Sequence, residues 1–154
     1  MSVYTCRIAQ LEDVESVHQF ELSIRFPDDP ESFENKMQVW DSSYRKESLE
    51  HYFKLGWSFI AFNSEKKIEG FFLGQPLLFF DKQTQTLWIE HVSATNIEVK
   101  TELIDIAFRL SREKHFQRVL LPSDLETQGL TKPFQFVKWP RQTSTLKTTK
   151  SIHS

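Results

Sequence analysis

The spacing of apolar and polar residues changes along the chain, and these changes divide it into predicted strands and helices. Residues 3–8 alternate as in a strand, whereas the apolar positions of residues 11–22 recur every three or four residues, as in a helix. Residues 27–30 hold two prolines and two aspartates, which predicts a turn, and residues 31–39 follow as a short helix. The chain therefore opens with a strand and two helices.

The next predicted helix is bounded by residues typical of helix ends. Asp41, Ser42 and Ser43 can cap its start, and Gly56 can end it in the left-handed conformation. Three strands are predicted after it, over residues 57–62, 68–80 and 86–93, with turns at 63–67 and 81–85. Pro76 cannot donate a hydrogen bond to a strand ladder, so we expect an edge, a bulge or a strand exit there.

The clearest helix of the sequence spans residues 97–114. Its apolar stripe consists of Val99, Leu103, Ile106, Ala107 and Leu110. Residues 117–121 have few polar positions, which is typical of a strand covered on both faces, and Pro122 ends them. A strand, this helix and a second strand in that order predict a βαβ unit.

Two more elements are predicted near the C-terminus: a helix over residues 124–136, weakened by a glycine and a proline inside it, and a strand over residues 143–149. The whole order predicts an α+β (α/β) fold, a single mixed, mostly antiparallel central sheet of about six to seven strands flanked by helices on both faces. One such domain covers residues 1–150, and residues 151–154 form a short tail.

The composition is typical of a soluble globular protein and not of a disordered chain. Hydrophobic residues make up 39% of the sequence, charged residues 26%, and fourteen residues are Phe. The single cysteine, Cys6, cannot form an internal disulfide, which fits a reducing compartment. Because the sequence lacks a signal-peptide pattern and a long apolar segment, we expect a cytoplasmic protein that is not inserted in a membrane.

The distribution of charges and the spacing of the histidines bear on whether the protein binds nucleic acid or a metal ion. The net charge of -2 gives no general reason to expect nucleic-acid binding. Only residues 127–154 are locally basic, with Lys132, Lys138, Arg141, Lys147, Lys150 and no acidic residue. The five histidines and Cys6 do not have the spacing of metal ligands, so no metal site is predicted.

Three stretches carry patterns that occur together in one known family. Residues 5–14 combine an arginine, a few small residues and an aspartate where a strand gives way to a helix. Residues 57–71 form a predicted hairpin with Ala61 in one strand and Gly70 in its partner, and residues 103–121 join the long helix to the buried strand. In this order they resemble the GNAT superfamily of acyl-CoA-dependent N-acetyltransferases across roughly the full length of the chain, which implies the GNAT fold.

The resemblance also implies a site for acetyl-CoA or another acyl-CoA at the start of the long helix. In this family a glycine-containing loop there binds the pyrophosphate through backbone N–H groups. Here residues 95–102 contain neither glycine nor arginine and bring Glu98 and Glu102 close to the expected phosphate position. The residues expected to hold the cofactor are Val92 and Ala94, through the strand backbone, and Val99, Lys100 and Thr101, at the helix start.

Two candidates for the general base lie on the strand that precedes this helix. Glu90 and His91 are adjacent, so strand alternation places them on opposite faces and only one can face the cleft. Either could accept a proton from an ammonium directly or through a water molecule, and either could instead be a hydrogen-bonded structural residue. Residues 123–136 hold neither the tyrosine that many family members use to protonate the thiolate nor the asparagine before it.

Two functions of different classes follow. The first is an acyl-CoA-dependent N-acyltransferase, transferring an acetyl group to a small-molecule or peptide amine of unknown identity. The second is a degenerate GNAT-fold protein without this activity that serves as a binding or regulatory module. If the first holds, the two central strands should separate after Glu90 to admit the pantetheine arm. The exposed aromatic residues leave room for a homodimer.

Overall fold

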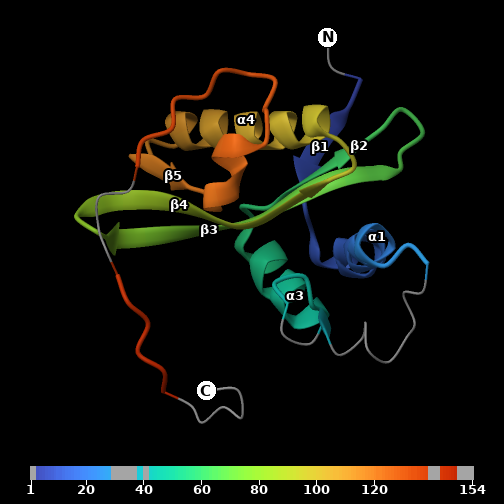
Figure 1. Cartoon of the computed structure of the whole chain (residues 1–154), viewed down its shortest axis with the longest axis horizontal. Helices are drawn as coiled ribbons and strands as arrows, with labels where there is room; N and C mark the ends of the chain where they lie inside the picture. Colours follow the sequence, from blue (N-terminus) through green and yellow to red (C-terminus); the bar gives the residue numbers. More distant parts are fainter. Residues whose placement is uncertain (1–2, 29–37, 40–41, 139–142, 149–154) are drawn as a thin grey trace.

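The computed structural model describes residues 3–28, 38–39, 42–138 and 143–148. It has three layers, with one five-stranded sheet between two layers of helices (Figure 1). The strands, in sheet order, are β1 (Thr5–Ile8), β2 (Phe59–Phe62), β3 (Ile68–Phe80), β4 (Gln83–Ala94) and β5 (Arg118–Leu120). Neighbouring strands are antiparallel, except that β4 and β5 are parallel.

Helices cover both faces of the sheet. They are α1 (Val14–Arg25), which follows a 3-10 turn (Leu11–Asp13), α3 (Lys46–Leu55), α4 (Ile97–Glu113) and the short 3-10 helix η2 (Ser123–Thr127). Figure 1 shows α1 and α3 below the sheet and α4 above it. This arrangement confirms the predicted fold class, although the sheet formed by the described residues has five strands and not six or seven.

Adjacent residues of the central strands supply two separate hydrophobic cores. The core under α1 and α3 contains Ala9, Val17, Leu49, Phe53, Ile60, Phe71 and Leu73. The core under α4 contains Ala61, Phe72, Leu87, Ile89, Val99, Leu103 and Ala107. Because burial of a large apolar side chain contributes about 1.5–3 kcal/mol, these two clusters hold the three layers together.

The β3–β4 hairpin extends well beyond the rest of the sheet. β3 pairs with β2 only as far as Phe72, so Pro76 lies on a stretch of β3 that has lost this neighbour, as the edge prediction requires. The turn has two residues, Asp81 and Lys82, with φ of 51° and 69°. Such values are typical of type I′ hairpin turns, whose twist matches that of the strands. The turn is therefore shorter than predicted, and β4 begins at Gln83.

Two predicted elements near the C-terminus are wrong. The predicted helix over residues 124–136 is replaced by η2 and by irregular chain as far as residue 138. Gly129 has a φ of 73° and Pro133 lacks a backbone N–H, so a continuous helix cannot pass through them. The predicted strand over residues 143–149 is also absent: residues 143–148 are exposed and irregular, and residue 149 lies outside the described residues.

Helix α3 starts later than predicted but ends where expected. It begins at Lys46, and the Ser42 hydroxyl donates to the Val39 carbonyl oxygen (2.7 Å), so this serine closes a turn and does not cap the helix. Gly56 ends the helix with a φ of 78°. The short helix predicted over residues 31–39 lies largely outside the described residues.

Gly74 is required by the close approach of two chain segments. A Cβ atom there would lie 2.4 Å from the Trp57 carbonyl oxygen, and the Gly74 N–H donates to the buried Ser58 hydroxyl (3.0 Å). We expect Gly74→Ala to lower the free energy of unfolding by about 1–3 kcal/mol, because backbone must move to admit the methyl group. Urea denaturation measures this loss. Ser64→Ala, in the exposed turn between β2 and β3, is the control, and an equal or larger loss there would contradict the prediction.

Candidate functional site

Strands β4 and β5 separate in the middle of the sheet. Their parallel pairing ends at Trp88 and Leu120, while β4 continues to Ala94 and the chain after β5 turns away through Pro122 into η2. Beyond Trp88, β4 has no neighbour on this side among the described residues. The separation therefore begins slightly earlier than expected, ahead of Glu90, and leaves a length of β4 backbone unpaired.

A bulge lies just beyond the point where the strands separate. Leu73 pairs with His91 and Gly74 with Ile89, so Glu90 is the extra residue on β4. Because the bulge interrupts the alternation, the prediction that Glu90 and His91 occupy opposite faces is wrong. Both side chains lie on the face covered by α1 and α3. Burial and the charge of Glu90 raise the pKa of Tyr52 on α3, and the His91 imidazole is hydrogen-bonded to Glu21 on α1.

The Glu90 carboxylate is oriented by an aromatic neighbour. The Trp88 indole N–H donates to Glu90 Oε2 (2.7 Å). Burial, reinforced by the negative charge of Glu90, raises the pKa of Tyr52 to about 12, so this phenol stays protonated at neutral pH. Glu90 Oε1 has no hydrogen-bond partner within the described residues and remains able to accept one.

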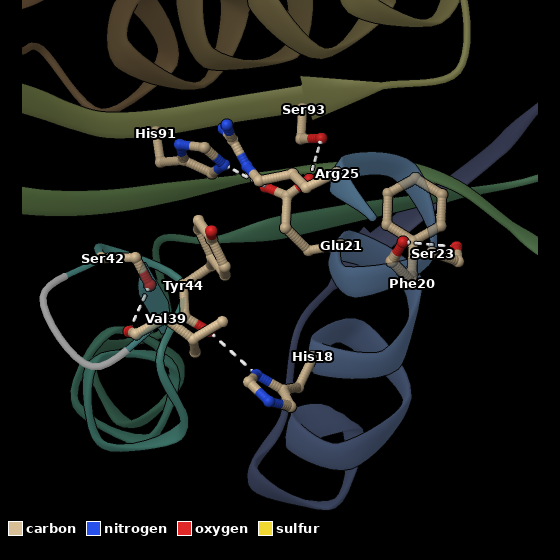
Figure 2. A network of polar contacts seen from close by, with 10 residues as sticks. All are labelled: His18, Phe20, Glu21, Ser23, Arg25, Val39, Ser42, Tyr44, His91 and Ser93. Atoms are coloured by element: carbon tan, nitrogen blue, oxygen red, sulfur yellow. Dashed lines mark hydrogen bonds and ion pairs between the residues drawn. The ribbon is translucent and has the colours of Figure 1, made fainter. Parts of the chain in front are cut away.

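Figure 2 shows a buried carboxylate that joins α1 to β4. Glu21 is 0% exposed; its Oε1 accepts a hydrogen bond from the Ser93 hydroxyl (2.6 Å), and its Oε2 is hydrogen-bonded to His91 Nε2. Arg25 Nε lies 3.8 Å from the same Oε2. Burial alone would raise the pKa of Glu21, but the hydrogen bonds from His91 and Ser93 outweigh it and hold this pKa below its usual value.

Aromatic rings fix the imidazole of His91. Its ring centroid lies 5.6 Å from that of Phe71 and 5.9 Å from that of Tyr44. The Tyr44 ring packs under the Arg25 guanidinium at 4.9 Å, and the Tyr44 carbonyl oxygen is hydrogen-bonded to His18 Nδ1 (3.1 Å; Figure 2). These contacts tie α1, the segment before α3 and β4 into one unit.

The sequence prediction missed Glu21, although its position carried a signal. The residue falls on the inward stripe of the first helix, between apolar positions at residues 17 and 22. A carboxylate on such a stripe must find donors inside the protein, because an unpaired buried charge is costly.

The start of α4 is closed by its own capping residue. Asn96 Oδ1 accepts from the Val99 N–H (3.0 Å), and the Asn96 carbonyl oxygen accepts from the Lys100 N–H (3.2 Å). Thr101 is also engaged, since its hydroxyl donates to the Ile97 carbonyl oxygen (2.8 Å) and accepts from the Thr131 N–H (3.1 Å). The connection from β4 thus has two residues, Thr95 and Asn96, without a phosphate-binding loop.

Lys100 and the exposed Glu98 are the charged residues of the first helical turn. The Lys100 ammonium donates to Gln128 Oε1 (2.8 Å), which reaches it from the end of η2. Lys100 forms no ion pair within the described stretches of the chain, so its positive charge is not neutralised there. Val92 and Ala94 instead face α4 and pack against its core, where Val99 is fully buried.

The predicted site residues therefore form two groups. Val92, Ala94, Val99, Lys100 and Thr101 lie between β4 and the start of α4, and Glu90 and His91 act on the opposite face. No three His, Cys, Asp or Glu side chains of the described residues are grouped so as to hold a metal ion. None of the helices formed by these residues combines the length and apolar character needed to cross a bilayer.

Comparisons with known proteins agree on the fold. No protein-family model and no curated protein matches the sequence. Similar solved structures include a ribosomal-protein-alanine N-acetyltransferase from Brucella melitensis, which is 13% identical with a TM-score of 0.56 over 92% of this chain and 100% of that one. A second is the PaiA N-acetyltransferase of Thermoplasma acidophilum in complex with coenzyme A, at 16% identity and a TM-score of 0.55 over 75% and 76% of the two chains.

A third similar structure is an aminoglycoside acetyltransferase from an uncultured soil sample in complex with sisomicin. It is 18% identical, with a TM-score of 0.52 over 92% of this chain and 97% of that one. The chain therefore has the fold of the GNAT acetyltransferases.

Proposed function

We propose that this protein is an acyl-CoA-dependent N-acyltransferase that transfers an acetyl group to an amine. The separation of β4 from β5 beside Glu90 is the observation that supports it most directly. A carboxylate with one free oxygen then stands next to unpaired strand backbone, and the chemistry needs both: backbone groups to hold an acyl donor and a base to accept a proton.

The residues around the separation fit the thioester end of an acyl-CoA better than its phosphate end. Among the described residues, none pairs with the edge of β4 toward β5 from Ile89 to Ala94, so this edge can hydrogen-bond an extended amide chain. At the start of α4, the Asn96 side chain engages the Val99 N–H and the Asn96 carbonyl oxygen engages the Lys100 N–H, so the Lys100 ammonium is the cation of this turn that a phosphate would contact. Coenzyme A would thus be held by strand backbone and by one cation.

Glu90 is the better candidate for the general base. His91 Nε2 is already hydrogen-bonded to the buried Glu21, whereas Glu90 Oε1 is free within the described residues. Glu90 would take a proton from the substrate ammonium, directly or through a water molecule, and release a neutral amine. A bound acyl-CoA would supply the acyl group: its C–S bond would break as the new C–N bond forms, and the second proton lost by the amine nitrogen would pass to the departing sulfur or to water. The thiolate, with its low pKa, can leave without a tyrosine to protonate it.

The acceptor proposed here is a small-molecule or peptide amine. Two similar structures support this range, because one is named for a ribosomal-protein alanine and another holds the aminoglycoside sisomicin. A panel of a peptide with a free N-terminus, spermidine and sisomicin therefore samples the chemistry, with release of free thiol from acetyl-CoA as the signal.

Acetyl-CoA binding is the first test. A ligand present at 100 times its Kd stabilises the folded state by about 2.7 kcal/mol, so we expect Tm to rise by roughly 5–10 °C. Lys100→Glu should weaken binding at least about tenfold, because it places a negative charge where a phosphate is expected. Lys114→Glu, at the other end of α4, is the matched control. An affinity unchanged by Lys100→Glu would contradict this position for the phosphates.

The alternative function is a binding or regulatory module that has lost acyl-CoA. The capped start of α4 and the exposed Glu98 favour it, because both oppose an anion at this helix end. If millimolar acetyl-CoA gives no heat in calorimetry and no thermal shift, the transferase is excluded and this alternative is established.

A further inference from the structure

The last strand of the sheet, β5, has a free outer edge. β5 stands beside β4 alone, so among the described residues no strand pairs with its other side. It ends at Leu120, which pairs with Trp88 at the point where β4 and β5 separate. A strand edge of this kind can hydrogen-bond one more extended chain, as in peptide recognition by strand addition.

A large groove, which we call the α4–β5 groove, runs beside this strand. It encloses about 2020 Å³, more than the roughly 300–1,000 Å³ of common small-molecule pockets. Lys82 and Trp88 both line it, and the six positions between them correspond to about 20 Å of extended strand. A groove of this length fits an extended segment of several residues.

The acidic residues of the groove are already engaged by its own cations. Of the described residues that line it, Asp81 and Asp105 carry carboxylates. Asp81 Oδ2 lies 2.9 Å from Arg118 Nη1, and Asp105 Oδ2 lies 3.0 Å from Lys132 Nζ. These two pairs neutralise the negative charge of the lining.

The remaining cations of the groove leave it positively charged. They are Lys82, Arg112 and Lys138, which are exposed and form no ion pair within the part of the chain that the structure describes. The Arg112 guanidinium lies 5.7 Å from the ring centroid of Phe108, so its charge is held over the groove wall. Complementary charge favours a ligand with several negative groups.

The wall between these cations is aromatic. The ring centroids of Phe108 and Phe134 are 6.5 Å apart, and those of Phe134 and Phe136 are 6.3 Å apart. Ser111, 3% exposed and three positions after Phe108, also lines the groove, and its hydroxyl has no hydrogen-bond partner among the described residues. Because a buried hydroxyl usually has a partner, this one marks a place where a ligand can accept a hydrogen bond.

One end of the groove adjoins the proposed general base. Trp88 lines the groove and donates its indole N–H to Glu90 Oε2 (2.7 Å). The lining continues through Leu120 and Pro122, where the chain turns away from β4. A chain that ends here brings its terminus to the Trp88 side of Glu90.

We propose that the α4–β5 groove binds an acidic peptide, extended and antiparallel to β5, with its amino terminus at Trp88 and its acidic side chains near Lys82 and Arg112. At about 3.3 Å per residue, those acids lie roughly five to seven residues after the amino terminus. A nucleic acid would match the cations but not the free strand edge. The role of this peptide as acyl acceptor rests on the transferase function proposed above, whereas its binding does not.

Peptide binding, measured by fluorescence anisotropy without acetyl-CoA, tests the proposal. The probe is a peptide of about eight residues with a free amino terminus, glutamates at its other end and a dye after them. In a second probe lysines replace the glutamates. The wild-type protein should bind the acidic probe at least about tenfold more tightly, with a difference that shrinks as salt is added. Equal affinity, or a preference for the lysine probe, would overturn the proposal.

Charge reversal locates the binding site. The double variant Lys82→Glu with Arg112→Glu should raise the Kd of the acidic probe at least about tenfold, and both side chains are exposed, so it should fold normally. Lys54→Glu with Lys67→Glu changes the net charge equally at exposed lysines outside the lining and should leave the Kd unchanged. Equal losses in the two double variants would mean that net charge, and not this groove, governs binding.

N-methylated probes test the strand addition. Only alternate N–H groups of an extended peptide face β5, so methylating one alternate set of nitrogens should abolish binding and methylating the other should preserve it. Equal effects of the two sets would rule out the strand arrangement. A single-stranded oligouridylate that displaces the acidic probe at a lower concentration than the unlabelled peptide does would assign the groove to nucleic acid and refute the proposal.

Thiol release from acetyl-CoA separates this inference from the proposed function. If the acidic peptide binds in the groove but no amine of the panel, the peptide included, releases thiol, the transferase proposal fails and the peptide site stands. If another amine is acylated while the acidic probe does not bind, the transferase stands and the peptide site is wrong.

Discussion

Replacing Glu90 with glutamine is expected to lower kcat for acyl transfer by roughly 10²–10⁴-fold, the usual contribution of a positioned general base. The amide oxygen of glutamine can still accept the hydrogen bond from the Trp88 indole, so the bulge and the local fold should persist. An amide cannot take a proton from an ammonium, and the substrate amine would then have to lose it to water. The apparent KM for acetyl-CoA should change little, because Glu90 acts on the amine.

The measurement is thiol release from acetyl-CoA, using the amine of the panel that reacts fastest with the wild-type protein. Glu50→Gln, an exposed carboxylate on α3, is the matched control and should keep the wild-type rate. If Glu90→Gln also keeps that rate while His91→Gln loses it, His91 is the base and the assignment to Glu90 is wrong.

The order of the elements could be predicted from residue spacing, because apolar residues must be spaced so that they reach one of the two hydrophobic cores. The inward positions of α4 and the adjacent apolar pairs of β2 and β3, such as Ile60 with Ala61, must face cores on opposite sides of one sheet. The same reasoning failed at Glu90, since alternation holds only while a ladder is regular. A bulge depends on the pairing of two strands, here at Leu73 and Gly74, and no pattern of apolar and polar residues within β4 predicts it.

The C-terminal elements failed for a related reason. Residues 143–148 have the composition of a strand, but a strand forms only where a neighbour accepts its hydrogen bonds. At the start of α4, by contrast, the sequence correctly indicated a helix without a glycine-containing loop. The sequence did not predict that Asn96 would accept hydrogen bonds from the N–H groups of Val99 and Lys100.

Replacing the buried Glu21 with glutamine is expected to lower the free energy of unfolding by roughly 3 kcal/mol. The amide cannot accept hydrogen bonds from both His91 and Ser93 as the carboxylate does, because an NH₂ donor replaces one of the two oxygens, so a buried polar group loses its partner. Guanidinium denaturation at neutral pH measures the loss. Glu15→Gln, an exposed carboxylate on the same helix, is the control and should leave the free energy of unfolding close to the wild-type value.

The pH dependence of stability separates the charge of Glu21 from its shape. Its pKa in the folded protein lies below the ordinary value of 4.5, so the folded state binds fewer protons there than the unfolded chain. The stabilisation is complete above the unfolded pKa and is lost as the pH falls through the folded one. The wild-type unfolding midpoint should therefore drop as the solution is acidified below about pH 4.5, and the Glu21→Gln curve should drop less. Parallel acid limbs would mean that other carboxylates, such as Asp13 beside Arg7, carry the dependence and that Glu21 is not held as an anion.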